Sequence, residues 1–235
     1  MLEKSLGMII AAGGSGSRYS RSKNKLMVIY KDKPLLVHTL EKFLPVVTPG
    51  CMVVAAPQHQ IISMRKTVDS FLPDNNIKWT FGGPTRLASV ANAAFMLPEE
   101  LDLVAIHDGA RPLASVELLR KLCRAAIETG GAIPGMIPTN TIKSVDSQGL
   151  IKENLIRSEL AEVATPQVFR FFRYKNALDQ LSGELLSGAE ESPVFTDDAA
   201  IFTHAGYQVK VVFSKEPNPK ITRPEDLDFL NSLDV

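Results

Sequence analysis

A glycine-rich loop followed by two cations is the first group of residues that could do chemistry. The loop reads Ala11-Ala12-Gly13-Gly14-Ser15-Gly16-Ser17-Arg18, and Lys25 follows seven residues after Arg18. Glycines allow a tight turn and expose successive N–H groups to an anion, so Gly14 and Gly16 would let a phosphate approach closely. Two fixed cations beside a phosphorus atom would stabilise the charge that develops there during group transfer.

Two familiar phosphate-binding loops do not fit this sequence. A Walker loop requires Gly-Lys-Ser/Thr after its glycines, and none is present. A dinucleotide fingerprint requires G-x-G-x-x-G, but Gly16 is followed by Ser17-Arg18-Tyr19. What remains is a glycine loop bearing a cation, and the alternative is a solvated loop of Ser, Lys and Arg with no ligand.

A second candidate group follows a later apolar run and reads His107-Asp108-Gly109-Ala110-Arg111-Pro112. Asp108 could bind a divalent cation that bridges triphosphate oxygens, because Mg²⁺ takes one or two protein carboxylates together with phosphates and water. The structural alternative is a helix cap or turn aspartate. Arg111 could bind a substrate phosphate or pair with a carboxylate, and His107 is expected to be a packed histidine.

Short apolar runs alternate with longer helical patterns, and this alternation predicts the elements that position these residues. We expect strands at residues 6–12, 51–56, 77–81, 101–107, 132–137 and 207–213. We expect helices at residues 34–44, 61–71, 85–96, 116–129, 172–186, 197–204 and 224–233. The order favours an α/β fold with a mostly parallel, Rossmann-like sheet and helices on both faces. Ligands of such sheets lie at the carboxyl ends of the strands, where both candidate groups fall.

Residues 138–167 interrupt this alternation, because they carry no helical stripe. They indicate extended pieces at 141–144 and 150–155 around a turn at Asp146-Ser147-Gln148-Gly149. A hairpin alone is marginal in water, so it should pack on something, most economically a partner subunit. We therefore predict a single domain over 1–235 with a protruding β-arm at about 138–163 that serves dimerisation and substrate binding.

The composition limits the class of protein. The chain has 235 residues, 45% of them hydrophobic, with 26 basic and 26 acidic side chains. A neutral balance argues against a protein that coats nucleic acid, and no run is long enough to cross a membrane or to act as a secretory signal. Cys51 and Cys123 have no metal-ligand spacing and make no disulfide framework. We expect a cytoplasmic protein without nucleic-acid or membrane partners.

A resemblance becomes specific at this point. Gly-x-Gly-x-Arg at 14–18, followed by Lys25-Leu26, resembles the opening of the cytidylyltransferases of the non-mevalonate isoprenoid pathway. Those enzymes join CTP to 2-C-methyl-D-erythritol 4-phosphate. Further stretches resemble the same family in order along nearly the whole chain: 33–40, 82–90, 107–112, Ala164-Thr165-Pro166-Gln167-Val168-Phe169, Thr196-Asp197-Asp198-Ala199 and Lys220-Ile221-Thr222-Arg223-Pro224-Glu225-Asp226-Leu227.

The resemblance implies a reaction and a set of site residues. CMP would pass from CTP to 2-C-methyl-D-erythritol 4-phosphate, giving 4-diphosphocytidyl-2-C-methyl-D-erythritol and pyrophosphate, with Mg²⁺ on Asp108 and a homodimer built through the arm. The implied catalytic residues are Arg18, Lys25, Arg157 and Lys220. The implied nucleotide-binding residues are Ala12, Gly13, Gly14, Ser15, Gly16, Gly83, Arg86, Ser89 and Gly109. The implied substrate-binding residues are Arg111, Thr141, Thr165 and Thr196, with Thr141 and Arg157 reaching a neighbouring subunit's site.

This sequence departs from the family's usual pattern at four positions. Gly13 and Gly109 stand where alanine is common, Asn24 where proline is common, and Pro84 where an acidic residue is frequent. The Pro84 difference concerns one of the contacts that the resemblance implies for the base.

Three other functions remain alternatives. A ribitol 5-phosphate cytidylyltransferase shares the loop, but the runs that begin at Thr196 and Thr222 favour the methylerythritol enzyme. A non-catalytic nucleotide-binding regulatory subunit on the same fold would be expected to have lost Arg18 or Lys25. A nicotinamide-dependent redox protein would need the missing fingerprint.

Overall fold

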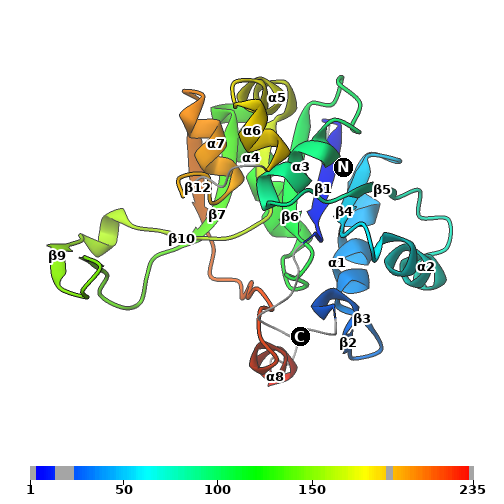
Figure 1. Ribbon diagram of the computed structural model, residues 1–235, viewed down its shortest axis with the longest axis horizontal. Coiled ribbons are helices and arrows are strands. Elements are labelled where there is room, and N and C mark those ends of the chain that lie inside the picture. The colour runs from blue at the N-terminus through cyan, green and yellow to red at the C-terminus, as the bar shows by residue number, and fades with distance from the viewer. Residues whose placement is uncertain (1–3, 14–23, 189–192, 233–235) are drawn as a thin grey trace.

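The computed structural model describes residues 4–13, 24–188 and 193–232, and its centre is a twisted sheet (Figure 1). Within these residues, eight strands pair into one sheet whose main path runs β10-β7-β11-β6-β1-β4-β5, with β12 on β7. Four strands run parallel in one half of it: β1 (Leu6–Ala11), β4 (Met52–Ala56), β5 (Lys78–Phe81) and β6 (Leu103–Asp108). Their carboxyl ends therefore meet at one edge, as the alternation of strands and helices predicts.

The other half of the sheet mixes directions around β7 (Gly131–Met136). β11 (Gln167–Arg170) lies antiparallel between β6 and β7, and β10 (Glu162–Val163) continues along the same edge of β7. β12 (Val209–Phe213) runs parallel along the opposite edge. The sequence predicts extended chain up to residue 167 but no strand in the sheet there, so β10 and β11 are additions to the prediction.

Helices pack against both faces of the sheet, which accounts for the continuous apolar strands (Figure 1). Every residue of β4 and of β6 is buried, so both of their faces must be covered. The helices are α1 (Leu35–Phe43), α2 (Ile61–Phe71), α3 (Arg86–Ala94), α4 (Val116–Thr129), α5 (Phe171–Asp179), α6 (Gly183–Ser187), α7 (Asp198–His204) and α8 (Glu225–Ser232). Among the described residues, no helix combines the length and apolar character needed to span a bilayer.

Helix starts near the sheet's carboxyl edge are fixed by side-chain caps. Thr85 accepts a hydrogen bond from the Ala88 N–H at the start of α3, and Asp197 does the same for the Ala200 N–H at the start of α7. Each cap satisfies one of the N–H groups that a helix start leaves without a partner. α3 and α7 therefore begin at defined positions beside the site.

One predicted helix is wrong in extent. The expected helix at 172–186 is two helices, because Ser182 caps a new start at α6 by accepting from the Leu185 N–H. Hydroxyl caps of this kind favour helix starts over helix interiors.

The remaining elements are short. They are the β2–β3 pair (Ile29–Tyr30 and Lys33–Pro34), the hairpin β8 (Lys143–Val145) and β9 (Ile151–Asn154), and 3-10 helices at Lys25–Met27, Leu44–Val46 and Arg157–Glu159. The hairpin confirms the predicted arm, and Figure 1 shows it projecting away from the sheet.

Candidate active site

The loops that follow β1 and β5 meet at the carboxyl edge of the sheet. A Cβ built on Gly82 would lie 3.3 Å from the Gly13 Cα, and one on Gly83 would lie 2.4 Å from the Ala88 Cβ. Only glycine fits at Gly83, because no real Cβ comes so close to another side chain. Ser89 is buried beside Gly13, with its hydroxyl donating to the Thr85 carbonyl (2.8 Å). These predicted nucleotide-binding residues therefore lie together at one edge.

The remaining loop residues divide between described and undescribed parts of the chain. Ala12 is buried, and its N–H donates to the Ala55 carbonyl (2.9 Å), which anchors the loop to the sheet. Residues lying outside the described part are Gly14, Ser15, Gly16 and Arg18. Their roles stay predictions.

Lys25 opens the 3-10 helix Lys25–Met27, and its amine reaches the C-terminal part of the chain. The Asn24 side chain accepts from the Leu26 N–H (3.0 Å) and caps this helix, so the departure from proline at this position brings a hydrogen-bonded cap. The Lys25 Nζ donates to the Ile221 carbonyl (3.0 Å). This bond places the Lys25 amine on the backbone of the residue that follows Lys220, although 196 residues separate Lys25 from Ile221 in the sequence.

Asp108, the last residue of β6, is the centre of a cluster of cations. Its carboxylate lies 3.0 Å from the Lys220 Nζ, 3.1 Å from the Arg111 Nε and 3.5 Å from the Arg86 Nε, and the side chain is 8% exposed. Burial alone would raise the pKa of Asp108, but Lys220, Arg86 and Arg111 outweigh it and hold that pKa well below its usual range. Asp108 is therefore ionised at neutral pH.

Hydrogen bonds to backbone carbonyls hold Arg111 and the segment that follows Lys220 in position. The Arg111 Nη1 donates to the Asn218 carbonyl (2.7 Å), and the Asn218 Nδ2 donates to the Thr165 carbonyl (2.7 Å). The Ile221 N–H donates to the Ala110 carbonyl (2.9 Å). The sequence allows Arg111 either to bind a substrate phosphate or to pair with a carboxylate. In this structure it pairs with the carboxylate of Asp108.

His107 and Thr165 fix the backbone of Asp108. The Thr165 Oγ1 accepts from the Asp108 N–H (3.0 Å) and lies 2.9 Å from the His107 Nδ1, while the His107 Nε2 lies 3.1 Å from the Arg111 carbonyl. Burial lowers the pKa of His107 to about 4, so the ring is neutral. Because a carbonyl can only accept, Nε2 carries the proton and Nδ1 accepts from the Thr165 hydroxyl. His107 is the packed histidine that the sequence suggests.

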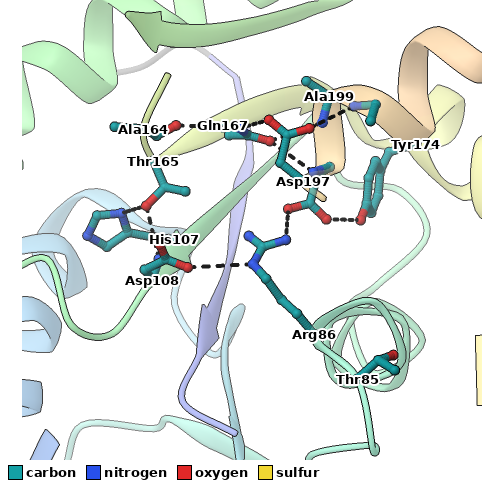
Figure 2. Close-up of polar contacts among 12 residues, drawn as sticks. Thr85, Arg86, His107, Asp108, Ala164, Thr165, Gln167, Tyr174, Asp197 and Ala199 are labelled. Atoms are coloured by element: carbon teal, nitrogen blue, oxygen red, sulfur yellow. Dashed lines mark hydrogen bonds and ion pairs between the residues drawn. The ribbon is translucent and has the colours of Figure 1, made fainter. Parts of the chain in front are cut away.

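Arg86 joins Asp108 to a second buried carboxylate (Figure 2). Its Nη1 lies 2.7 Å from the Asp198 Oδ2, and the Tyr174 hydroxyl donates to the Asp198 Oδ1 (2.7 Å). Gln167 accepts from the Asp198 N–H (3.1 Å) and donates to the Asp197 carboxylate (2.9 Å). The sequence analysis does not single out Tyr174. It contains Gln167, Asp197 and Asp198 only as members of motifs and assigns them no role.

These side chains open onto a pocket of about 230 Å³. It is lined by Arg86, Asp108, Arg111, Val163, Ala164, Thr165, Gln167, Thr196, Asp197 and Lys220. Six of them are among the residues that the sequence assigns to nucleotide, substrate, metal or catalysis.

Three predicted site residues lie elsewhere in this chain. Thr141 and Arg157 are exposed on the arm, where the Arg157 Nη1 donates to the Thr139 carbonyl (3.0 Å). Gly109 is buried, and a Cβ on it would lie 3.1 Å from the Leu36 Cδ1. A Cβ at Gly109 would therefore require Leu36 to move by a few tenths of an ångström.

Asp108 is the residue that could hold a metal ion. Within the described ranges, no three His, Cys, Asp or Glu side chains gather as a metal-binding group. A single ionised carboxylate suits Mg²⁺, which takes most of its ligands from phosphates and water when it accompanies a nucleotide. The donor set therefore fits a magnesium–triphosphate ligand rather than a metal caged by protein alone.

Comparisons with known proteins agree with this geometry. Residues 6–232 match the family model described as IspD: 2-C-methyl-D-erythritol 4-phosphate cytidylyltransferase. Proteins of that name from Prochlorococcus marinus (strain MED4) and Microcystis aeruginosa are 34% and 36% identical; each alignment covers 94% of this chain, and 95% and 94% of those proteins respectively. The crystal structure of 4-diphosphocytidyl-2C-methyl-D-erythritol synthase from Anaerococcus prevotii superposes with a TM-score of 0.80 at 26% identity, covering 97% of both chains.

The comparisons confirm the expected fold and reaction class, and they do not favour the ribitol phosphate enzyme or the silent subunit. A family match over nearly the whole chain is far more specific than any one of the short motifs. The chain belongs to the 2-C-methyl-D-erythritol 4-phosphate cytidylyltransferase family and is a CTP-dependent nucleotidyltransferase.

Proposed function

We propose that the pocket around Asp108 is where this chain transfers CMP from CTP to 2-C-methyl-D-erythritol 4-phosphate, with release of pyrophosphate. The observation that carries the proposal is the convergence of Arg86, Arg111 and Lys220 on one carboxylate at the carboxyl edge of the sheet. Such a concentration of fixed positive charge suits a ligand that carries several phosphates.

The reaction is an in-line attack on the α-phosphate of CTP. The nucleophile is an oxygen of the acceptor phosphate, which is already ionised at neutral pH, so no general base is required. The protein supplies positioning and charge neutralisation. The oxygen–phosphorus bond forms on one side as the bond to pyrophosphate breaks on the other, and pyrophosphate leaves with the electron pair.

Four cations divide the work of stabilising charge. Arg18 and Lys25 stabilise the α-phosphate in the transition state, and Lys220 and Arg157 hold the acceptor phosphate. The bond from Lys25 to the Ile221 carbonyl supports this division, because it ties Lys25 to the segment that carries Lys220. The attacking and attacked phosphates would then be held by neighbouring side chains.

Asp108 would hold the magnesium ion, which supplies charge neutralisation to the triphosphate when it is bound. The buried and ionised state of Asp108 supports this assignment. Arg86 and Arg111 already point at the same place, so they would contact the phosphate oxygens around it.

The loop edge selects the base. Gly83 and Ser89 lie where two loops almost touch, and their backbone groups would read the edge of cytosine. A purine is larger and would be excluded by the close approach of these loops. CTP should therefore be strongly preferred over ATP and GTP.

The arm makes the enzyme a homodimer with shared sites, built on a single domain over the rest of the chain. Its apolar side chains Val145, Leu150, Ile151 and Ile156 are each more than half exposed, which favours burial against a second copy. Arg157 and Thr141 would then reach the partner's pocket. A cytoplasmic location stays a prediction.

A pyrophosphate-release assay tests the function. Each of the four nucleoside triphosphates is offered with 2-C-methyl-D-erythritol 4-phosphate or with ribitol 5-phosphate. CTP with the methylerythritol substrate should be turned over far faster than any other pair. Comparable turnover with ATP or GTP would contradict the base assignment, and a preference for ribitol 5-phosphate would establish the alternative acceptor.

A further inference from the structure

The guanidinium of Arg86 has one nitrogen whose purpose the observed contacts do not explain. Its Nη1 and Nε face Asp198 (2.7 Å) and Asp108 (3.5 Å). Its Nη2 is buried and has no hydrogen-bond partner in the described part of the chain. A buried charged donor without an acceptor is costly, so Nη2 is suited to an anionic acceptor in the pocket that Arg86 lines.

Both carboxylate oxygens of Asp198 are occupied by hydrogen bonds within the protein. It is fully buried and does not line the pocket. Its Oδ1 accepts from Tyr174 and its Oδ2 from Arg86, while Gln167 accepts from the N–H groups of Asp198 and Ala199. The Asp198 carboxylate therefore acts on the pocket through Arg86, which lines it.

Tyr174 makes the far end of this chain of contacts rigid. It is fully buried, and its ring stacks on Phe169 with centroids 5.2 Å apart and planes 17° apart. Burial and then the charge of Asp198 raise the pKa of Tyr174 well above its usual value, so its hydroxyl remains a donor to Asp198.

Two carboxylates compete for Arg86, and the shorter contact is the one to Asp198. A long arginine side chain has many rotamers, and without Asp198 it could swing fully onto Asp108 beside Arg111 and Lys220. The guanidinium would then turn Nη2 away from its present direction. Asp198 keeps Arg86 between the two carboxylates.

We propose that Asp198 and Tyr174 are positioning residues that hold the Arg86 guanidinium so that its Nη2 group donates to a phosphate of bound CTP. This inference rests on the proposed function, because CTP supplies the phosphate. A donor fixed before the ligand arrives costs less entropy on binding, so the loss should fall on CTP affinity more than on the chemical step.

The test is a double-mutant cycle on CTP binding, measured by calorimetry with Mg²⁺ and without acceptor so that no turnover occurs. The proteins are the wild type, Asp198→Asn, Arg86→Gln and the double variant. Asp198→Asn should weaken CTP binding about tenfold, the order of one charged hydrogen bond, and raise KM for CTP more than it lowers kcat. In the Arg86→Gln background the same change should have no further effect.

Matched controls separate positioning from general damage to the fold. Asp179→Asn changes an exposed aspartate at the end of α5 and should leave CTP affinity unchanged. Tyr174→Phe keeps the stacked ring and removes only the hydroxyl, so it should weaken CTP binding about threefold. This variant tests the positioning role if Asp198→Asn does not fold.

The outcomes separate this inference from the proposed function. Equal CTP affinity in the wild type and Tyr174→Phe, or additive losses in the double variant, would overturn the positioning role while leaving the function intact. A wild-type protein that binds no CTP would overturn the proposed function itself.

Discussion

The Asp108 cluster and the arm differ in how much of their structure a single chain provides. Asp108 is buried among three cations, and two of them are held by further contacts to residues far away in the sequence, Arg86 by Asp198 and Arg111 by the Asn218 carbonyl. In the arm, β8 and β9 pair with each other, and Val145, Leu150, Ile151 and Ile156 remain exposed. One region is organised before any ligand or partner arrives, whereas the other carries apolar surface suited to a partner. Substitutions in the two regions should therefore fail in different ways.

The largest effect is expected at Lys25, whose amine contacts the backbone next to Lys220. Lys25→Ala should lower kcat about 10²–10³-fold, roughly 3–4 kcal/mol, because it removes a charge fixed beside the developing oxyanion. Steady-state kinetics measure kcat, and a thermal melt measures whether the variant keeps its stability. Lys66→Ala, on the exposed face of α2, is the matched control and should keep full activity. Near-normal kcat in Lys25→Ala would refute the role.

Breaking the centre of the cluster should cost the fold as well as the activity. Asp108→Asn leaves Arg86, Arg111 and Lys220 without their shared counter-charge, so the free energy of unfolding should fall by about 3 kcal/mol. Asp69→Asn removes an exposed pair with Arg65 and should cost under about 0.5 kcal/mol. Denaturant titration of both variants at pH 7 makes the comparison. Equal losses of unfolding free energy in the two variants would mean that the buried cluster stabilises the fold no more than an exposed ion pair does.

Acid should weaken the cluster through His107. The folded-state pKa is lowered to about 4 from an ordinary value near 6.5, so the unfolded chain binds the extra proton first as the pH falls. The stability that the neutral ring provides is complete above about pH 6.5 and is lost as the pH falls toward 4, about 2 kcal/mol between pH 7 and 4.5. Unfolding at several pH values should show a shallower dependence in His107→Asn than in the wild type. His59→Asn is the control for loss of an exposed histidine.

The smallest effect on folding, with a large effect on activity, is expected in the arm. Arg157→Ala should change the free energy of unfolding by less than about 0.5 kcal/mol, because the side chain is exposed. The homodimer should nevertheless be inactive, since Arg157 would serve the partner's site. Activity assays and denaturant titration on the same preparation should show activity lost without stability, whereas Asp108→Asn should lose both.

Mixing variants tests whether the two regions belong to one site. After co-refolding, Arg157→Ala and Lys25→Ala should recover up to about one quarter of wild-type activity, because half the dimers are mixed and each has one intact site of two. No recovery despite demonstrated subunit exchange would mean that both residues act within one chain.

The regular elements were largely predictable because they depend on local pattern. α2 and α4 have the bounds that their apolar periodicity predicts, and β1, β4 and β6 are the continuous apolar runs of the sequence. β11 escaped prediction because four residues show no clear period, and its place between β6 and β7 depends on pairing with strands more than 30 residues away in the sequence.

The site was predictable as a set of residues but not as a network. The chemistry of Asp108 and Arg111 makes them candidates, the family resemblance adds Lys220, and the meeting of all three depends on the fold. Asp198 stood inside a recognised run, yet its partners Arg86 and Tyr174 lie 112 and 24 residues away. Sequence spacing cannot show such contacts, because burial and tertiary packing create them.

The contact between Lys220 and Asp108 has a consequence for how the protein is made. A chain emerges from the ribosome N-terminus first, and its early segments can fold while later ones are still being added. Asp108, Arg86 and Arg111 are therefore present before Lys220, and Lys25 is present before the Ile221 carbonyl that it contacts. The first strands can form early, but an unfinished chain lacks the complete charge cluster. Catalytic competence should thus arrive late in translation, which limits any action on CTP by incomplete chains.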